Sequence, residues 1–342
     1  MKRVFVLNLI FLVALCGTSF AQNKEIYEKH KSDFDYDRSQ PLNAEVKVLD
    51  EQSYYTKYHV SYDSVNGERV PGFLYIPKNL KAYKESLDDK KLPAFEKKSI
   101  KIDGPPWPTI FIMHFLQSDK TFVEPIAPEW ATYGYAVFAI DGVLKGERAE
   151  SGKNILDYDP KATVANIRQQ VIDIRRGADF LATRDDIDFF RLGFLGVSMG
   201  AITGTIACGV DGRFRVIVLA DGAASLRSVY ENKSTMKEIQ VEVEKAAKKL
   251  EELGYTFEEA LEIFEPIDPV HYAPYLSPRP VLMINGTKDE LFPKEAMEAL
   301  HAAVGEPKKV QWFNSGHILP IPNVLHLTQK WFKHFLSQID SD

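Results

Sequence analysis

Short apolar runs alternate with helix-like segments along most of this chain. The first two runs, residues 54–61 and 69–76, have strand-like composition, and the Asn66–Gly67 pair between them is typical of an antiparallel hairpin. From Thr109 onward, strand-like runs are separated by segments that can form helices. The runs are 109–113, 135–140, 191–195, 215–220, 281–285 and 310–313. This alternation predicts a largely parallel sheet with helices on both faces, and ligands outside the carboxyl ends of its strands.

Helical periodicity is clearest between Val164 and Leu181. Apolar residues recur there at spacings of three and four, which predicts a helix with one buried face. Residues 122–133 can supply an earlier helix, and residues 324–336 the last one.

One stretch interrupts the alternation of strands and helices. A helical stripe ends before Gly254, and Thr256 with Glu259 then offers a capping box for a second, shorter helix. The stripe consists of Met236, Ile239, Val243, Ala246, Leu250 and Leu253. We expect a helical cap over residues 224–267, folded over the carboxyl edge of the sheet. Most of its apolar residues should pack on the domain, and the others could line an acyl pocket.

The amino-terminal residues have the pattern of an export signal. Two basic residues precede the apolar stretch 4–15, and Ser19 and Ala21 are small residues at the positions that a signal peptidase reads. The apolar stretch is shorter than a membrane-spanning helix needs, and the bulky Leu15 argues against lipidation of Cys16. We therefore expect an exported protein, periplasmic or secreted, without a stable membrane anchor.

Composition narrows the function classes. The 342 residues are 45% hydrophobic and 26% charged, enough for one large core or a core with a small cap. The formal net charge of -6 argues against nucleic acid or an anionic membrane as the main partner. After removal of the signal, Cys208 is the single cysteine, so stability must come from packing. No dinucleotide fingerprint, phosphate loop or paired-histidine zinc spacing occurs, so we expect no cofactor and no metal.

The strongest chemical signal is the run from Gly196 to Gly200. A serine between two glycines at a strand-to-helix turn is typical of a nucleophile elbow. The turn forces Ser198 into a strained backbone, and the glycines relieve the crowding around it. The Met199 amide, at the start of the helix, would then point to where an oxyanion forms.

Ser198 needs a base, and His317 is the candidate. A neutral imidazole can accept the serine proton near neutral pH and return it to the leaving group. His317 follows the strand 310–313, in a loop at the carboxyl end of the predicted sheet. Six of the other histidines lie before the parallel core, on expected helices or before the penultimate strand.

Asp289 is the preferred acid to orient this imidazole. It follows the strand 281–285 and precedes His317, which gives the chain order Ser, Asp, His. Asp221, at the end of an earlier strand, satisfies the same order, and Glu290 is adjacent to Asp289. Only the loop position favours Asp289, and the two competitors stay open.

The second oxyanion donor should come from the loop after the strand 109–113. This loop begins His114, Phe115, Leu116, and the Leu116 amide is the candidate.

Together these residues resemble the α/β-hydrolases of the dienelactone hydrolase-like, acetyl xylan esterase-like and prolyl oligopeptidase-like group. The shared marks are 173–176, 188–193, 196–200, 211–214, 268–269, 280–289 and 316–317. Asp141 with Gly146, Glu147 and Arg148 resembles the loop that braces the site in this group. Many of these relatives carry a glycine where this chain has Phe115. Dienelactone hydrolases proper use a cysteine nucleophile, so that reaction is not expected here.

The resemblance implies an α/β-hydrolase fold over residues 54–342, interrupted by the cap. Residues 1–21 are then the signal peptide and residues 22–53 an amino-terminal arm. It implies an exported serine hydrolase that cleaves a small-molecule or glycan-linked carboxylic ester through an acyl-enzyme. The alternatives are a peptidase or amidase of the prolyl oligopeptidase-like group, and an inactive binding protein with this fold.

Overall fold

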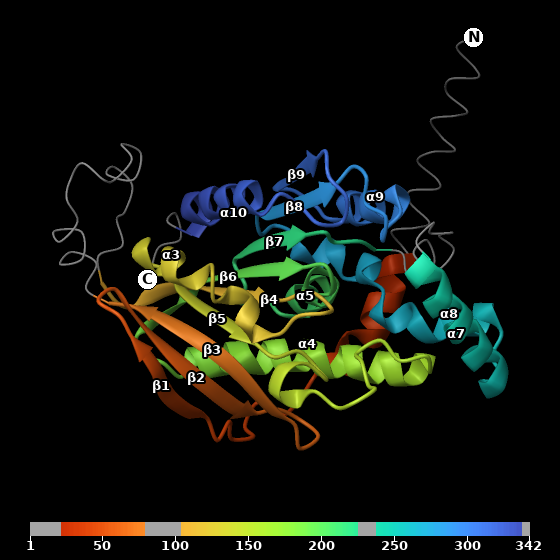
Figure 1. Cartoon of the computed structure of the whole chain (residues 1–342), viewed down its shortest axis with the longest axis horizontal. Coiled ribbons are helices and arrows are strands. Elements are labelled where there is room, and N and C mark those ends of the chain that lie inside the picture. Colours follow the sequence, from red (N-terminus) through yellow and green to blue (C-terminus); the bar gives the residue numbers. More distant parts are fainter. Residues whose placement is uncertain (1–21, 79–103, 225–236, 337–342) are drawn as a thin grey trace, which may run out of the picture.

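A nine-stranded sheet dominates the fold (Figure 1). The computed structural model describes residues 22–78, 104–224 and 237–336. In this part the strand order is β1-β2-β3-β5-β4-β6-β7-β8-β9. The strands are β1 (Glu45–Glu51), β2 (Tyr55–Asp63), β3 (Arg69–Pro77), β4 (Trp107–Met113), β5 (Ala136–Ile140), β6 (Ile187–Val197), β7 (Val216–Ala220), β8 (Val281–Gly286) and β9 (Lys308–Phe313).

The sheet is antiparallel at one side and parallel over the rest. Pairing is antiparallel from β1 through β2 and β3 to β5, and parallel from β5 through β4 to β9. The predicted hairpin and the mostly parallel sheet are therefore confirmed.

Helices cover both faces of the sheet, as predicted. Helices α4 and α5 pack on one face, and α3 and α10 pack on the other. In β4, Phe111 and Met113 join the core beneath α4, while Ile110 and Ile112 join the core beneath α10. The helices are α3 (Ala127–Thr132), α4 (Pro160–Ala182), α5 (Met199–Val210), α7 (Lys237–Leu253), α8 (Phe257–Phe264), α9 (Lys294–Ala303) and α10 (Ile321–Leu336). Short 3-10 helices cover Lys31–Phe34, Lys120–Val123, Gly146–Arg148, Glu265–Ile267, Pro269–His271 and Ala273–Leu276.

Helix α4 holds the amino-terminal arm against the domain. Residues 22–30 are helical, and Phe34 just after them is fully buried in the core beneath α4. The guanidinium of Arg176, itself buried, donates hydrogen bonds to the main-chain carbonyls of Gln40 and Asp63. One guanidinium therefore bonds both the arm and the end of β2, which ties them to helix α4.

Strand β1 lies within residues 22–53, which the sequence assigned to the arm. It pairs with β2 at the edge of the sheet, but its side chains are almost all exposed. Val46 and Val48 alternate with Glu45 and Lys47, but Leu49 follows directly and the register shifts between Val48 and Asp50, so the alternating pattern is limited to four residues.

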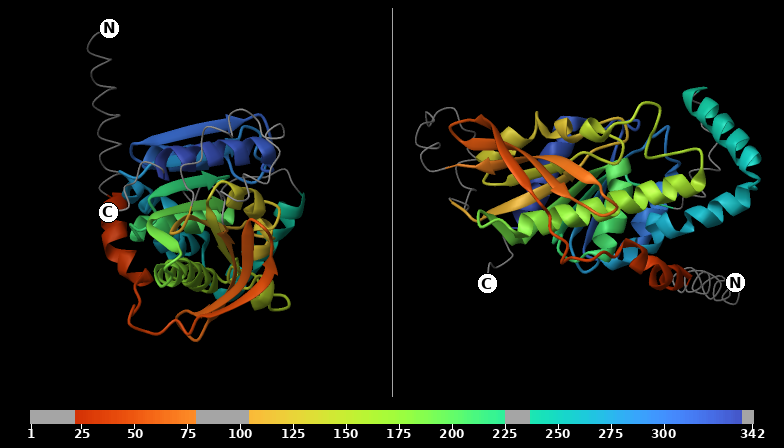
Figure 2. Two further views of the ribbon diagram at one scale, coloured as in Figure 1. Left: turned by 90° about the vertical axis from the view of Figure 1, so that its left-hand side faces the viewer. Right: turned by 90° about the horizontal axis from the view of Figure 1, so that it is seen from below.

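Helices α7 and α8, from the stretch that we expect to form the cap, lie at one end of the molecule (Figures 1 and 2). The predicted capping box of Thr256 and Glu259 is present, and α8 packs against α4 and buries Ala260 and Phe264. Helix α7 packs less closely than expected: Leu250 is half-buried and Leu253 is exposed. Met236 and the side chains of Ile239 and Val243 lie outside the described residues.

Among the helices that the structure describes, none is both long enough and apolar enough to cross a membrane. The expected signal peptide and Cys16 lie outside the described residues. Cys208 is a buried free thiol in α5.

Candidate active site

Ser198 lies on a strained turn between β6 and α5. Its backbone has φ 52° and ψ -112°, a conformation that residues other than glycine rarely adopt. A side chain at Gly196 would collide with the carbonyl of Gly200, and one at Gly200 would collide with the carbonyl of Met113. The Ser198 amide donates to the carbonyl of Ala220 on β7 at 2.8 Å, so the neighbouring strand holds the turn. The predicted strained strand-turn-helix geometry is present.

A chain of hydrogen bonds links Ser198, His317 and Asp289. The Oγ atom of Ser198 lies 3.0 Å from Nε2 of His317, and Nδ1 of His317 lies 2.8 Å from Oδ2 of Asp289. The other carboxylate oxygen of Asp289 accepts main-chain hydrogen bonds from Leu291 and Phe292 at 2.8 and 2.9 Å. The fold therefore brings together, from the ends of β6, β8 and β9, the three residues that the sequence named as nucleophile, acid and base.

Opposing effects act on the imidazole of His317. Burial lowers its pKa, but the hydrogen bond and the charge of Asp289, with the charges of Asp221 and Glu290, raise the pKa above its ordinary value. A raised pKa makes the neutral imidazole a stronger base, although it is also protonated over a wider range of mildly acidic pH.

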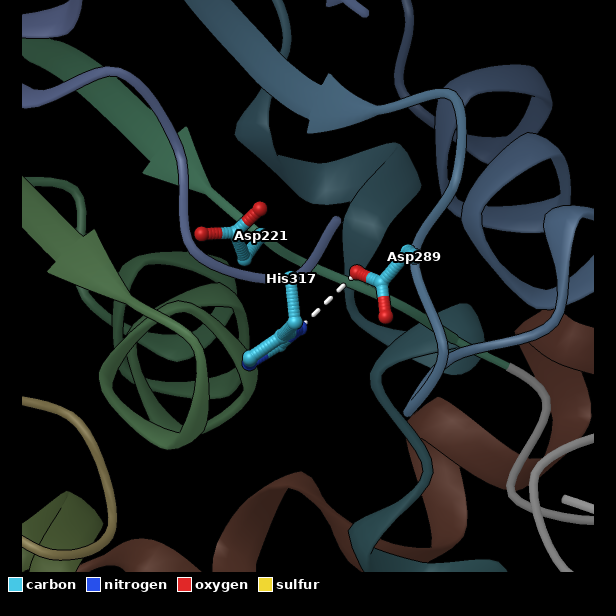
Figure 3. A group of neighbouring side chains, drawn as sticks. All are labelled: Asp221, Asp289 and His317. Carbon is cyan, nitrogen blue, oxygen red and sulfur yellow. Dashed lines mark hydrogen bonds and ion pairs between the residues drawn. The ribbon is translucent and has the colours of Figure 1, made fainter. Parts of the chain in front are cut away.

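Asp221 is a second carboxylate beside His317 (Figure 3). It follows β7 with a φ of 50°, it is 4% exposed, and its Oδ1 has no hydrogen-bond partner in the described part of the chain. Burial raises the pKa of Asp221 to about 8, against the lowering effect of His317. Of the two aspartates, only Asp289 is hydrogen-bonded to the imidazole, so the geometry favours Asp289 as the acid.

The side chains of Asp221, Asp289 and His317 offer atoms within 4.8 Å of one another that could together ligate a metal ion. The hydrogen bond between Asp289 and His317 already uses Oδ2 and Nδ1, so an ion bound there would compete with that bond. The absence of a metal and of a cofactor stays a prediction.

Glu290 supports the loop that carries the histidine. Its Oε2 accepts a hydrogen bond from the main-chain amide of His317 at 3.0 Å, and a side chain at Gly316 would collide with its carboxylate. Glu290 is thus bonded to the backbone of His317 and not to the ring. The sequence suggested Glu290 only as a competing acid. Its contact with the His317 amide forms only in the folded chain, so the sequence could not reveal it.

His114 fixes the loop that carries the predicted second oxyanion donor. The Gly142 amide donates to Nε2 of His114 at 3.0 Å, so Nδ1 carries the proton and donates to the carbonyl of Phe115 at 2.8 Å. That carbonyl and the Leu116 amide belong to one planar peptide and point in opposite directions. Burial lowers the pKa of His114, which favours the neutral ring that both bonds require.

The amides of Leu116 and Met199 have no hydrogen-bond acceptor within the described ranges. Both residues line the same cavity as Ser198. An oxyanion formed at Ser198 would need N–H donors of this kind. Phe115 packs edge to face against Phe122 and also lines the cavity.

Lys120 joins the loop after β4 to the loop after β5. We did not identify this residue from the sequence. Its buried ammonium group lies 2.7 Å from Oδ2 of Asp141 and 2.7 Å from Oε1 of Glu147. Asp141 also accepts the main-chain amides of Lys120 and Glu147. Arg148 pairs with Asp173 of α4 at 2.7 Å. The loop after β5 therefore braces the loop after β4, and a lone lysine gave no signal of this role.

A cavity of about 610 Å³ opens beside Ser198. Its walls come from the loops after β4 and β8, from α4 and α10, and from the end of the cap helix α8. The cavity lies at the carboxyl end of the parallel strands, where the alternation of strands and helices had placed the ligand site.

The fold and this turn define an α/β-hydrolase, in which a serine follows a central strand and the acid and histidine follow later strands. The sequence model of the prolyl oligopeptidase family matches residues 127–338, which is more than half of the chain. The chain belongs to this family and is a serine hydrolase. A comparison with curated protein sequences gave no match.

Several solved structures are similar in fold. An acetyl xylan esterase from a Paenibacillus species has 18% identity and a TM-score of 0.70, with 91% of this chain and 94% of that chain covered. An acetyl xylan esterase from a Thermoanaerobacterium species has 17% identity and a TM-score of 0.73 over the same shares. A glucuronoyl esterase from Solibacter usitatus has 14% identity and a TM-score of 0.58, with 92% and 91% covered.

The two aspartates can be separated by substitution. We expect Asp289→Asn to lower kcat by about 10³- to 10⁴-fold, because the imidazole loses the group that orients it and stabilises its charge. Asp221→Asn should cost less than about tenfold, since asparagine resembles the protonated acid. Steady-state hydrolysis of an aryl ester measures both. A large loss only in Asp221→Asn would reverse the assignment.

The pH dependence of Asp289→Asn gives a second readout. The carboxylate of Asp289 raises the pKa of His317, so its removal should move the acidic limb of kcat/KM to lower pH. A limb that stays in place would contradict this electrostatic role.

The role of His114 can be tested with His114→Phe. Loss of both ring hydrogen bonds frees the Phe115–Leu116 peptide, so we expect kcat to fall by about 10²-fold with little change in KM. His271→Phe is the matched control, because His271 is also a buried histidine, but its hydrogen-bond partner is Asn23 of the amino-terminal arm and not the loop after β4. Equal losses of kcat in the two variants, in step with their melting temperatures, would mean a purely structural role.

Proposed function

We propose that this serine hydrolase cleaves carboxylic esters through an acyl-enzyme on Ser198. The observation that carries the proposal is the chain of two hydrogen bonds, 3.0 Å from Ser198 to His317 and 2.8 Å from His317 to Asp289. The strained turn presents the hydroxyl at the floor of the cavity, and the imidazole is in reach of its proton.

In the first half of the reaction, Oγ of Ser198 attacks the ester carbonyl and its proton passes to Nε2 of His317. The carbonyl oxygen becomes an oxyanion that the amides of Leu116 and Met199 can bind. When the carbon–oxygen bond to the alcohol breaks, the imidazolium returns the proton to the departing oxygen. The Asp289 carboxylate stabilises the imidazolium between these two transfers.

In the second half, water takes the place of the alcohol. His317 accepts a proton from water as it attacks the acyl carbon, and it returns the proton to Oγ when the acid leaves. Ser198, His317 and Asp289 with the two amides supply every step of this chemistry, so the proposal includes no cofactor.

The esterase neighbours support an ester as the substrate, although their likeness to this chain is one of fold. The membership of the prolyl oligopeptidase family favours a peptide or amide bond as the second candidate. We propose further that the protein is exported, on the strength of its amino-terminal sequence pattern, and that its substrate is a small-molecule or glycan-linked ester met outside the cytoplasm.

The test compares wild type with Ser198→Ala on p-nitrophenyl esters and on matched p-nitroanilides. We expect ester hydrolysis that falls by about 10⁴-fold or more in the variant, and much slower anilide cleavage. Preferred cleavage of anilides would establish the peptidase alternative. Equal ester rates in the two proteins, with no labelling of wild type by a serine-directed phosphonate, would favour a binding protein.

A further inference from the structure

We propose that the group bound in the cavity is an extended apolar chain or ring of the ester, not an acetyl group or a sugar. This inference rests on the proposed ester hydrolysis and names the class of its substrate. It is carried by the chemistry of the cavity walls, by its mouth and by its volume.

The described walls of the cavity are apolar over most of their extent. Polar side chains among them are confined to Gln117, Thr163, Ser198, Asp221, Glu290 and His317, and the described lining includes no lysine and no arginine. Four of these six belong to the reacting end, where the hydrogen-bonded chain and its neighbouring carboxylates lie. The space beyond them therefore offers few partners to a hydroxyl or a charge.

The apolar side chains that line the cavity come from elements far apart in the sequence. Phe122 and Ile126 come from the segment after β4, Phe264 from the cap helix α8, and Val324 and Leu325 from α10. A sugar ring placed among them would leave hydroxyl groups without hydrogen bonds, which costs binding free energy. An alkyl chain or an aromatic ring has no such groups.

The mouth of the cavity is apolar as well. Leu156, Ile318 and Ile321 line the cavity and are 41%, 82% and 58% exposed. Large apolar side chains gathered at the rim of a pocket mark a surface that is covered when the ligand binds. The exposed rim extends the apolar contact beyond the enclosed space.

The volume points the same way. A space of about 610 Å³ lies within the range that holds drug-sized ligands, whereas an acetyl group has only one methyl carbon beyond its carbonyl. Asp221, the one buried carboxylate on this wall without a partner for its Oδ1, has its pKa raised to about 8 by burial. Burial therefore opposes a negative charge on this part of the wall.

Two ester series test the inference and separate the two ends of the substrate. The acyl series is p-nitrophenyl acetate, butanoate, hexanoate and octanoate, and the alcohol series is ethyl, butyl, hexyl and octyl acetate. Each buried methylene should raise kcat/KM by about fourfold, so we expect a rise of at least tenfold over the first three members of one series. The series that rises identifies the end of the ester that the cavity holds.

A value of kcat/KM that is constant or falls in both series, while acetates are hydrolysed, would overturn the inference and leave the proposed function intact. If no ester is hydrolysed faster than by Ser198→Ala, the proposed function itself is wrong, and this inference is overturned with it.

A double variant at the rim provides the second test. Leu156→Ser with Ile321→Ser should raise KM for the longest hydrolysed ester by about tenfold, because it removes apolar contact at the mouth. The matched control is Val48→Ser with Phe190→Ser, which removes two exposed apolar side chains, 57% and 52% exposed, that do not line the cavity. Equal KM values for the rim variant and the control would contradict the inference.

Discussion

The left-handed backbone of Ser198 is the constraint on which the rest of the site depends. The turn is strained, and it persists because β6, β7 and α5 hold it from three sides, with glycine at positions 196 and 200 where any side chain would collide with the main chain. This backbone conformation places Ser198 directly after the carboxyl end of β6 and the Met199 amide at the start of α5. The buried core beneath α4 and α5 is therefore what positions the nucleophile.

In two pairs of neighbouring groups, the members differ in environment and in role. The pairs are Asp289 with Asp221, and the two ends of the Phe115–Leu116 peptide. Asp289 accepts two main-chain amides as well as the imidazole, whereas Asp221 has an oxygen with no partner in the described chain and a pKa raised by burial. In the loop after β4, His114 binds the carbonyl end of one peptide, and the opposite end of that peptide is the free Leu116 amide. Each arrangement holds one polar group in place and leaves its neighbour available to the cavity. In our proposal, the bonded Asp289 orients His317, and the free Leu116 amide binds the oxyanion.

Much of this fold was predictable because its strands and helices carry local patterns. The hairpin, the largely parallel sheet, the face of α4 and the capping box of α8 follow from periodicity and turn chemistry, and the run around Ser198 predicts its own backbone. Strand β1 has no buried face, and its alternation of polar and apolar residues ends after Val48. The bonds of His114, Lys120 and Glu290 join loops that meet only in the folded chain, and the apolar cavity is the sum of walls from distant segments. Such features depend on tertiary contacts, which single-sequence patterns do not encode.

The most direct test of the account is the identity of the covalent intermediate. Wild type is mixed with p-nitrophenyl hexanoate, quenched in acid during the first turnovers, and analysed by intact mass and by peptide mapping. We expect a mass increase of one hexanoyl group per chain, located on Ser198. A hexanoyl group on any other residue, or an unchanged rate of p-nitrophenol release in Ser198→Ala, would contradict the claim that Ser198 is the nucleophile.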